Sequence, residues 1–81
     1  MVHELKIDIA YFKYVLVGEK TFEIRKNDRR YRVGDHIILN EWDEQTHSYT
    51  GRKVSGKIKY ITDFMQLPDY IVFSFDLDSN Q

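Results

Sequence analysis

The most distinctive stretch of the chain reads Gly18-Glu19-Lys20-Thr21-Phe22-Glu23-Ile24-Arg25-Lys26. From Thr21 to Arg25 its residues alternate, as they do in a strand with one buried face. This phase predicts that Phe22 and Ile24 point into the core, while Thr21, Glu23 and Arg25 share the other face. Lys20 precedes the strand, so an ammonium, a carboxylate and a guanidinium are expected on or beside one surface, where they could bind a polar ligand.

The segment before this stretch predicts a short strand followed by a short helix. Residues 3–7 alternate between polar and apolar, which is typical of a strand. Asp8 is a suitable N-cap for a helix over residues 9–17, and Gly18 stands where a left-handed C-terminal cap is favoured. We expect this helix to lie on a sheet through Phe12 and Leu16.

Three further strands are predicted after the stretch. Consecutive apolar residues in the segment 36–41 suggest a strand buried on both faces. The mostly polar residues 42–51 then predict a long, mobile hairpin loop. The segment 53–60 alternates, which places Val54, Ile58 and Tyr60 inward and makes Gly56 a bulge or a barrel corner.

The last part of the chain predicts a loop and a final strand. Residues 61–67 are expected to form a loop or one helical turn that ends at Pro68. Residues 70–77 predict a strand, because Ile71, Phe73, Phe75 and Leu77 are in phase. We expect residues 79–81 to fray.

Composition indicates a single small domain, residues 1–81. A chain of 81 residues has room for one core, and its 42% apolar content is sufficient to form it. There is no cysteine, and no segment predicts a signal peptide or a membrane span, so we expect a cytoplasmic protein that does not bind membranes. The elements together predict an α+β, mainly β fold, in which a small curled sheet closes to a β-barrel with one or two short helices. An open α+β sheet with the helix on one face is the alternative.

The letters Gly18-x-Lys20-x-x-Glu23-x-Arg25 resemble the G-x-K-x-x-E-x-R signature of ASCH domains, which are relatives of the PUA fold. The resemblance extends from His3 to about Tyr60 and includes three further segments, Val33-Gly34-Asp35, Glu41-Trp42-Asp43 and Tyr49-Thr50-Gly51-Arg52. This combination is similar to small bacterial and phage ASCH-like proteins. The resemblance implies a PUA-like barrel that recognises RNA or a nucleotide, and in some members the hydrolysis of an acetylated nucleoside.

The leading hypothesis is an RNA- or nucleotide-binding module with a small cleft lined by Lys20, Glu23 and Arg25. In such a cleft Arg25 could take a phosphate or a base edge, Glu23 could accept hydrogen bonds from an exocyclic amine, and Lys20 could donate. The plain alternative is a surface salt bridge between Glu23 and Arg25, worth less than about 1 kcal/mol.

Further ligand contacts are expected outside the motif. Lys26, Arg29 and Arg30 belong to a basic segment that could bind phosphate or form a solvated loop. The net charge of −1 argues against a protein that binds long nucleic acid mainly through its phosphates. Trp42 could stack on an unpaired base or plug the barrel, and Arg52 is a possible second anion contact.

Two other functions stay open. The first is an amidohydrolase acting on an acetylated nucleoside such as N4-acetylcytidine, with Lys20 and Glu23 as its catalytic residues. Lys20 matches the lysine that the resemblance implies for this activity, but Glu23 stands where a threonine is implied, so binding without catalysis comes first. The second is a protein-interaction adaptor that uses the 42–51 loop. The spacing of His3, His36 and His47 is unlike that of metal ligands, so we expect no metal and no cofactor.

Overall fold

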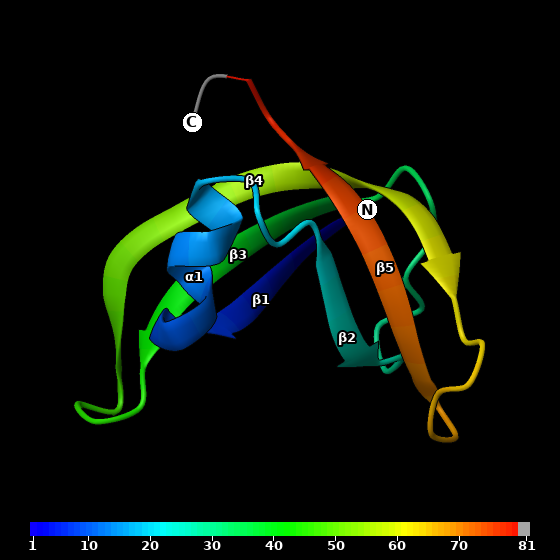
Figure 1. The fold of residues 1–81 in the computed structure, drawn as a ribbon, viewed down its shortest axis with the longest axis horizontal. Coiled ribbons are helices and arrows are strands. Elements are labelled where there is room, and N and C mark those ends of the chain that lie inside the picture. Colours follow the sequence, from blue (N-terminus) through cyan, green and yellow to red (C-terminus); the bar gives the residue numbers. More distant parts are fainter. Residues whose placement is uncertain (80–81) are drawn as a thin grey trace.

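Five strands form one curled sheet in the computed structural model, which describes residues 1–79 (Figure 1). They are β1 (Val2–Asp8), β2 (Phe22–Lys26), β3 (His36–Asp43), β4 (Ser48–Thr62) and β5 (Tyr70–Leu77), and α1 (Ile9–Leu16) is the helix. The order across the sheet is β1-β3-β4-β5-β2, with β1 parallel to β3 and the other pairs antiparallel. Of residues 79–81, which are predicted to fray, 80 and 81 lie outside the described residues.

The mainly β fold, the curled sheet and the short helix are confirmed. Closure to a complete barrel is not, because β1 and β2 end the sheet as its two edge strands. The result is a half-barrel whose long strand β4 arches over the other elements in Figure 1. Its concave side holds the buried apolar core, which comprises Leu5, Ile7, Phe12, Val15, Tyr31, Ile37, Leu39, Val54, Ile58, Ile71, Phe73 and Phe75.

Helix α1 begins and ends close to the predicted residues. The Asp8 side chain accepts a hydrogen bond from the backbone N–H of Ala10 at 2.8 Å, and Gly18 follows the helix with a φ of 81°. Phe12 and Val15 are buried, and the helix packs against β1 and β3. Leu16 is exposed, so its predicted role in packing is wrong. Phe12 and Val15 are three residues apart and define the face of the helix that packs on the sheet. Leu16 lies at the edge of that face.

The predicted phase of β2 is wrong. Glu23 is only 6% exposed, whereas Phe22 and Ile24 are 43% and 55% exposed. The register explains the inversion: Glu23 lies opposite Phe73, which points into the core. Residues opposite one another in an antiparallel pair share a face, so Glu23 faces inward with Phe73.

The long hairpin loop predicted for residues 42–51 is also wrong. Trp42 pairs with Tyr49, and Asp43 with Ser48, so the strands continue and only a short turn remains. Polar residues can extend a ladder beyond the core when their backbone groups pair. Strand β3 is buried mainly on one face, because Ile37 and Leu39 are buried while Ile38 is half-buried, which corrects the prediction of burial on both faces.

Strand β4 changes phase at an irregularity between Ile58 and Tyr60. Val54 and Ile58 point inward as predicted, but Tyr60 is exposed because the irregularity turns it to the outer face. Gly56 faces inward where β5 comes very close: a Cβ atom there would lie 2.4 Å from the backbone oxygen of Asp76. Glycine is therefore required by close backbone approach at this position.

Candidate functional site

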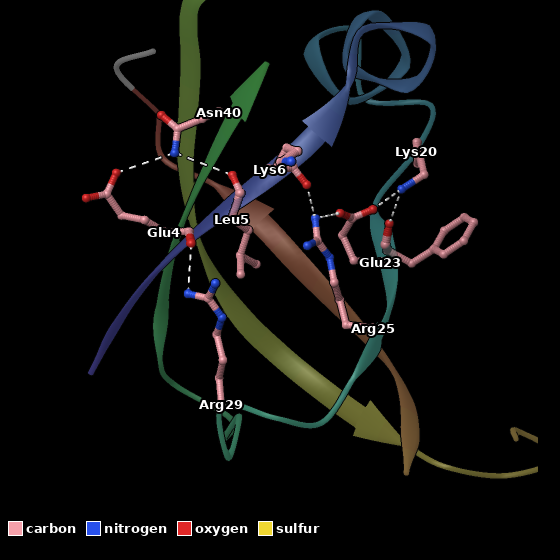
Figure 2. Close-up of polar contacts among 9 residues, drawn as sticks. Glu4, Leu5, Lys6, Lys20, Glu23, Arg25, Arg29 and Asn40 are labelled. Carbon is pink, nitrogen blue, oxygen red and sulfur yellow. Dashed lines mark hydrogen bonds and ion pairs between the residues drawn. The ribbon is translucent and has the colours of Figure 1, made fainter. Parts of the chain in front are cut away.

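The motif residues Lys20, Glu23 and Arg25 form one polar cluster, as Figure 2 shows. Lys20 donates from Nζ to the Glu23 carboxylate and, at 2.7 Å, to the backbone oxygen of Phe22. Arg25 donates from Nη2 to Glu23 Oε1 at 2.8 Å. Glu23 is therefore a buried carboxylate held between two cations, as a buried charge requires.

Two arginines, Arg25 of β2 and Arg29 of the segment that follows it, donate to the free edge of β1. Arg25 also donates to the backbone oxygen of Lys6, and Arg29 donates from Nη1 to the backbone oxygen of Glu4 at 2.9 Å (Figure 2). Both acceptors belong to β1, whose outer edge would otherwise present unpaired carbonyl groups. The predicted ligand contacts Arg25 and Arg29 thus have structural partners on the opposite edge strand.

A hollow of about 380 Å³ opens beside the polar cluster. Its lining residues come from α1, from β2 and from the segment between them: Tyr11, Lys20, Phe22, Glu23 and Ile24. A second hollow of about 320 Å³ shares three of these residues and extends between β1 and β2 as far as Lys26 and Tyr70. The two hollows together define a groove along the open side of the half-barrel, which we call the edge groove.

Aromatic rings flank the ammonium of Lys20 in the edge groove. Its Nζ lies 4.9 Å from the ring centroid of Phe22 and 5.8 Å from that of Tyr11. A cation over the face of an aromatic ring is attracted by the ring quadrupole. Both rings are also substantially exposed. The groove therefore offers a positive donor between two apolar, planar surfaces.

Tyr31 lies inside the half-barrel. Its ring packs against Phe73 at 5.2 Å and edge-on against His3 at 4.7 Å. Burial raises the pKa of the Tyr31 hydroxyl, while the charges of Arg25 and Arg29 oppose this effect. Tyr31 thus keeps a neutral hydroxyl near the arginines that bridge the sheet edges.

A second buried carboxylate belongs to the start of β3. His3 Nε2 lies 2.7 Å from Asp35 Oδ2, and the backbone N–H of Arg32 donates to the same oxygen at 3.1 Å. The hydrogen bond from His3 is the main reason that the pKa of Asp35 is lowered. This pair fixes the entry to β3 against β1, and we assign it a structural role.

Arg52 is bound to a third buried carboxylate, that of Glu41. It donates from Nε and Nη2 to the two oxygens of Glu41 at 2.9 and 2.8 Å, and Thr50 donates to Oε1 at 2.6 Å. These hydrogen bonds lower the pKa of Glu41, and the one from Arg52 has the largest effect. The same pairing raises the pKa of Arg52. Arg52 also lies over the ring of Phe12 in α1, with its Cζ 5.2 Å from the centroid. It therefore anchors the helix side of the fold, apart from the edge groove.

Trp42 lies on the outer face of the sheet. Its indole N–H donates to Glu44 at 2.7 Å, its ring meets Tyr49 edge-on at 4.9 Å, and Lys6 Nζ lies 4.1 Å from the ring centroid. The structure therefore separates Trp42 from the polar cluster. Of the remaining basic candidates, Lys26 lines the edge groove and Arg30 is exposed with a φ of 50°.

The sequence patterns did not predict the positions of two residues, Tyr11 in the edge groove and Glu41 in the core. Tyr11 lines both hollows of the edge groove, but an aromatic residue on a helix carries no signal that distinguishes a pocket wall from core. Glu41 did carry a signal, because it is in phase with the inward residues Ile37 and Leu39. A carboxylate at an inward position of a strand predicts a buried, paired acid.

Metal and membrane features can be stated for residues 1–79. No group of three His, Asp or Glu side chains in this part of the chain could hold a metal ion. Within the same residues, no helix is long and apolar enough to cross a membrane.

The fold and site define a small half-barrel whose open side carries the polar cluster around the buried Glu23 carboxylate. A family model matches residues 2–75, and the chain belongs to that family, described as "Domain of unknown function (DUF3850)". The chain is also 44% identical over 72 residues to a protein of Escherichia phage P2, named "Uncharacterized 12.9 kDa protein in GpA 3'region". This similarity covers 88% of the chain but only 64% of the phage protein, so the chain spans less than two thirds of its relative.

Proposed function

We propose that this chain is an RNA- or nucleotide-binding module that holds one unpaired base in the edge groove. The observation that carries the proposal is the position of the Lys20 ammonium between two exposed aromatic rings, those of Tyr11 and Phe22. Aromatic side chains bind single-stranded nucleic acid by stacking on base faces, at about 1–3 kcal/mol per base. The volume of about 380 Å³ is within the usual range of ligand pockets, roughly 300–1,000 Å³.

The polar cluster supplies the complementary chemistry. Lys20 donates to a base carbonyl or a phosphate, and Glu23 accepts from an exocyclic amine. Arg25 holds the Glu23 carboxylate in place through its hydrogen bond at 2.8 Å. Lys26, farther along the groove, faces the backbone phosphate of the bound nucleotide. Resemblance of the Gly18–Arg25 motif to ASCH domains supports the same ligand class, and a PUA-like relationship is part of this proposal.

The hydrogen bonds of Lys20 favour binding over hydrolysis. Its Nζ donates to both the Glu23 carboxylate and the Phe22 carbonyl. This is the arrangement of a charged hydrogen-bond donor, whereas an amide-cleaving lysine acts through its neutral amine. We rank the adaptor alternative lower, since it relied on a long loop at residues 42–51, where the strands pair as a hairpin.

The proposal can be tested with a matched pair of tyrosine variants. Tyr11 and Tyr49 are each 55% exposed, but only Tyr11 lines the edge groove. Binding of labelled single-stranded RNA and of mononucleotides would be measured by fluorescence polarisation and competition. Tyr11→Ala and Phe22→Ala should each weaken binding by roughly fivefold or more, as expected for a lost stacking contact. Tyr49→Ala should bind like the original chain; equal losses for Tyr11→Ala and Tyr49→Ala would rule out the groove.

A further inference from the structure

We infer that the edge groove takes a single strand of at least two nucleotides and holds a second base at Tyr70. The inference rests on the proposed function, which places one base beside Tyr11 and Phe22. It adds the class of ligand, an oligonucleotide in place of a free nucleoside or mononucleotide. Four features carry it: the shape of the groove, the place of a third aromatic ring, the distance between the rings, and the charges beside them.

The edge groove consists of two hollows, each of which has room for one base. Their volumes are about 380 and 320 Å³, and both lie within the usual range of ligand pockets, roughly 300–1,000 Å³. The two hollows share a wall that is made by Tyr11, Glu23 and Ile24. A base in the first hollow therefore leaves the second one open to the next part of the same ligand.

Tyr70 provides an aromatic wall in the second hollow. It lies opposite Lys26 at the end of the β2–β5 ladder, and it is 37% exposed. Strand β2 lies between β5 and the open side of the half-barrel, so Tyr70 reaches the groove through its side chain. A partly exposed tyrosine ring beside a groove is a stacking platform for any base, because every base has a π-face.

The two aromatic positions are too far apart to hold the same base. Phe22 and Lys26 are the first and last residues of β2, and four steps along a strand span about 13 Å at about 3.3 Å each. Tyr70 lies opposite Lys26, so about this distance separates it from Phe22 along the strand. Consecutive stacked bases are only about 3.4 Å apart. Both positions are therefore filled only by a ligand that carries more than one base.

A free cation lies beside Tyr70 in the second hollow. Lys26 lines this hollow, and its ammonium makes no ion pair within residues 1–79. The two carboxylates of the same hollow are already bound, because Asp8 caps α1 and Glu23 is held between two cations. Asp69 lines a separate hollow that does not include Lys26. Lys26 is thus placed to bind the phosphate that links two bases.

The edges of the sheet disfavour a peptide as the occupant of the groove. A peptide strand that is added to β1 would need the backbone carbonyl groups at its free edge. Those of Glu4 and Lys6 already accept hydrogen bonds from Arg29 and Arg25 (Figure 2). A nucleotide strand needs neither carbonyl group, because it is held by stacking and by contacts to its phosphates.

Binding as a function of ligand length tests the inference. Adenosine 5′-monophosphate and the oligoadenylates of two, three and four nucleotides would be titrated by calorimetry at one salt concentration. The affinity should rise at least about tenfold from the mononucleotide to the tetranucleotide, more than the number of equivalent bases alone provides, since a second stacked base adds to the first. An affinity that does not change with length would overturn the inference and leave the proposed function in place. No binding at any length would contradict the proposed function, and the inference with it.

Variants of Tyr70 separate the two base positions. Tyr70→Ala should remove the gain with length and leave the affinity for adenosine monophosphate unchanged within about twofold, whereas Tyr11→Ala should weaken binding at every length. Tyr70→Phe keeps the ring and should keep the gain. Tyr60→Ala is the matched control, because Tyr60 is 63% exposed and lies on β4. Equal losses for the mononucleotide and the tetranucleotide in Tyr70→Ala would overturn the second base position, as would the same effect in Tyr60→Ala.

The salt dependence of binding gives an independent arm. For the tetranucleotide, the slope of log affinity against log salt should become shallower by roughly 0.7 in Lys26→Gln, the value for one phosphate contact on a single strand. Lys53→Gln, at an exposed position of β4, is the control and should keep the original slope. Circular dichroism would show that each variant is folded. A slope in Lys26→Gln that equals that of the original chain would overturn the inferred path of the strand.

Discussion

Arg25 donates a hydrogen bond to the backbone carbonyl of Lys6 and thereby joins the two free edges of the sheet. The same guanidinium nitrogen donates to Glu23 at 2.8 Å. One side chain therefore holds the half-barrel together at its open side and positions the carboxylate of the candidate site. Binding and stability are coupled at this residue, so they must be measured separately.

Arg25→Ala should lower the free energy of unfolding by about 1–3 kcal/mol, because it removes hydrogen bonds from a charged group to Glu23 and Lys6. Arg25→Lys should recover only part of this loss, since a lysine side chain does not place its ammonium where Arg25 Nη2 reaches both acceptors. Urea midpoints measure the effect. Arg30→Ala, at an exposed position, is the control and should change little. Equal midpoints for Arg25→Ala and Arg30→Ala would show that the edge bridge contributes nothing.

The observed orientation of β2 predicts that Glu23 contributes more to stability than Phe22 or Ile24, although the sequence alternation suggests the opposite. Glu23→Ala should cost about 1–3 kcal/mol, because Lys20 and Arg25 lose a buried partner. Phe22→Ala and Ile24→Ala should each cost less than Glu23→Ala, since the two side chains are about half exposed and lie outside the core. Denaturant unfolding of the three variants decides the phase. A larger loss of unfolding free energy at Phe22 or Ile24 than at Glu23 would show that Phe22 and Ile24 face the core.

Gly56→Ala should be among the most destabilising single substitutions in the chain. The added Cβ would meet the backbone oxygen of Asp76 at 2.4 Å, so one strand has to move. Overpacking of this kind costs about 1–3 kcal/mol, and the rigid backbone neighbour places the expected loss at the upper end. Lys57→Ala, at the exposed neighbouring position, is the control. A thermal midpoint for Gly56→Ala close to that of the control would contradict the close approach.

Acid should weaken the fold through Glu41. Its folded-state pKa is lowered from the ordinary value of 4.5, chiefly by the hydrogen bonds of Arg52. A lowered pKa stabilises the fold above the ordinary value, and this contribution is lost as the pH falls toward the folded-state pKa. Glu41→Gln should therefore reduce stability at neutral pH and flatten its decline below about pH 5. Urea unfolding at several pH values tests this, with exposed Glu19→Gln as the control; an unchanged slope in Glu41→Gln would contradict it.

Local signals in the sequence predicted the ends of several elements well. Asp8 and Gly18 marked the limits of α1, because capping depends on a few neighbouring residues. The alternation of Ile71, Phe73 and Phe75 predicted the buried face of β5 correctly. The grouping of Lys20, Glu23 and Arg25 was also predicted, since these residues are close in the chain.

Features that depend on distant partners could not be predicted in this way. The alternation around Glu23 favours burial of Phe22 and Ile24, and only the pairing of Glu23 with Phe73 shows that the strand has the opposite phase. Tyr60 faces outward because of an irregularity in the β4–β5 ladder, which the even alternation of β4 does not indicate. The contact between Arg25 and Lys6 likewise requires knowing that β1 and β2 are the two edge strands.

The most direct test of the central claim is a nuclear magnetic resonance titration of the isotope-labelled chain with a short single-stranded RNA of mixed sequence. We predict saturable shifts at Tyr11, Lys20, Phe22 and Glu23, with much smaller changes at Trp42 and Tyr49 on the outer face. A duplex of the same length should compete weakly, because its bases are already stacked. Two results would contradict the account. One is the absence of chemical-shift changes in the edge groove at millimolar concentrations of RNA and of mononucleotide, and the other is a concentration of the changes at Trp42 and Tyr49.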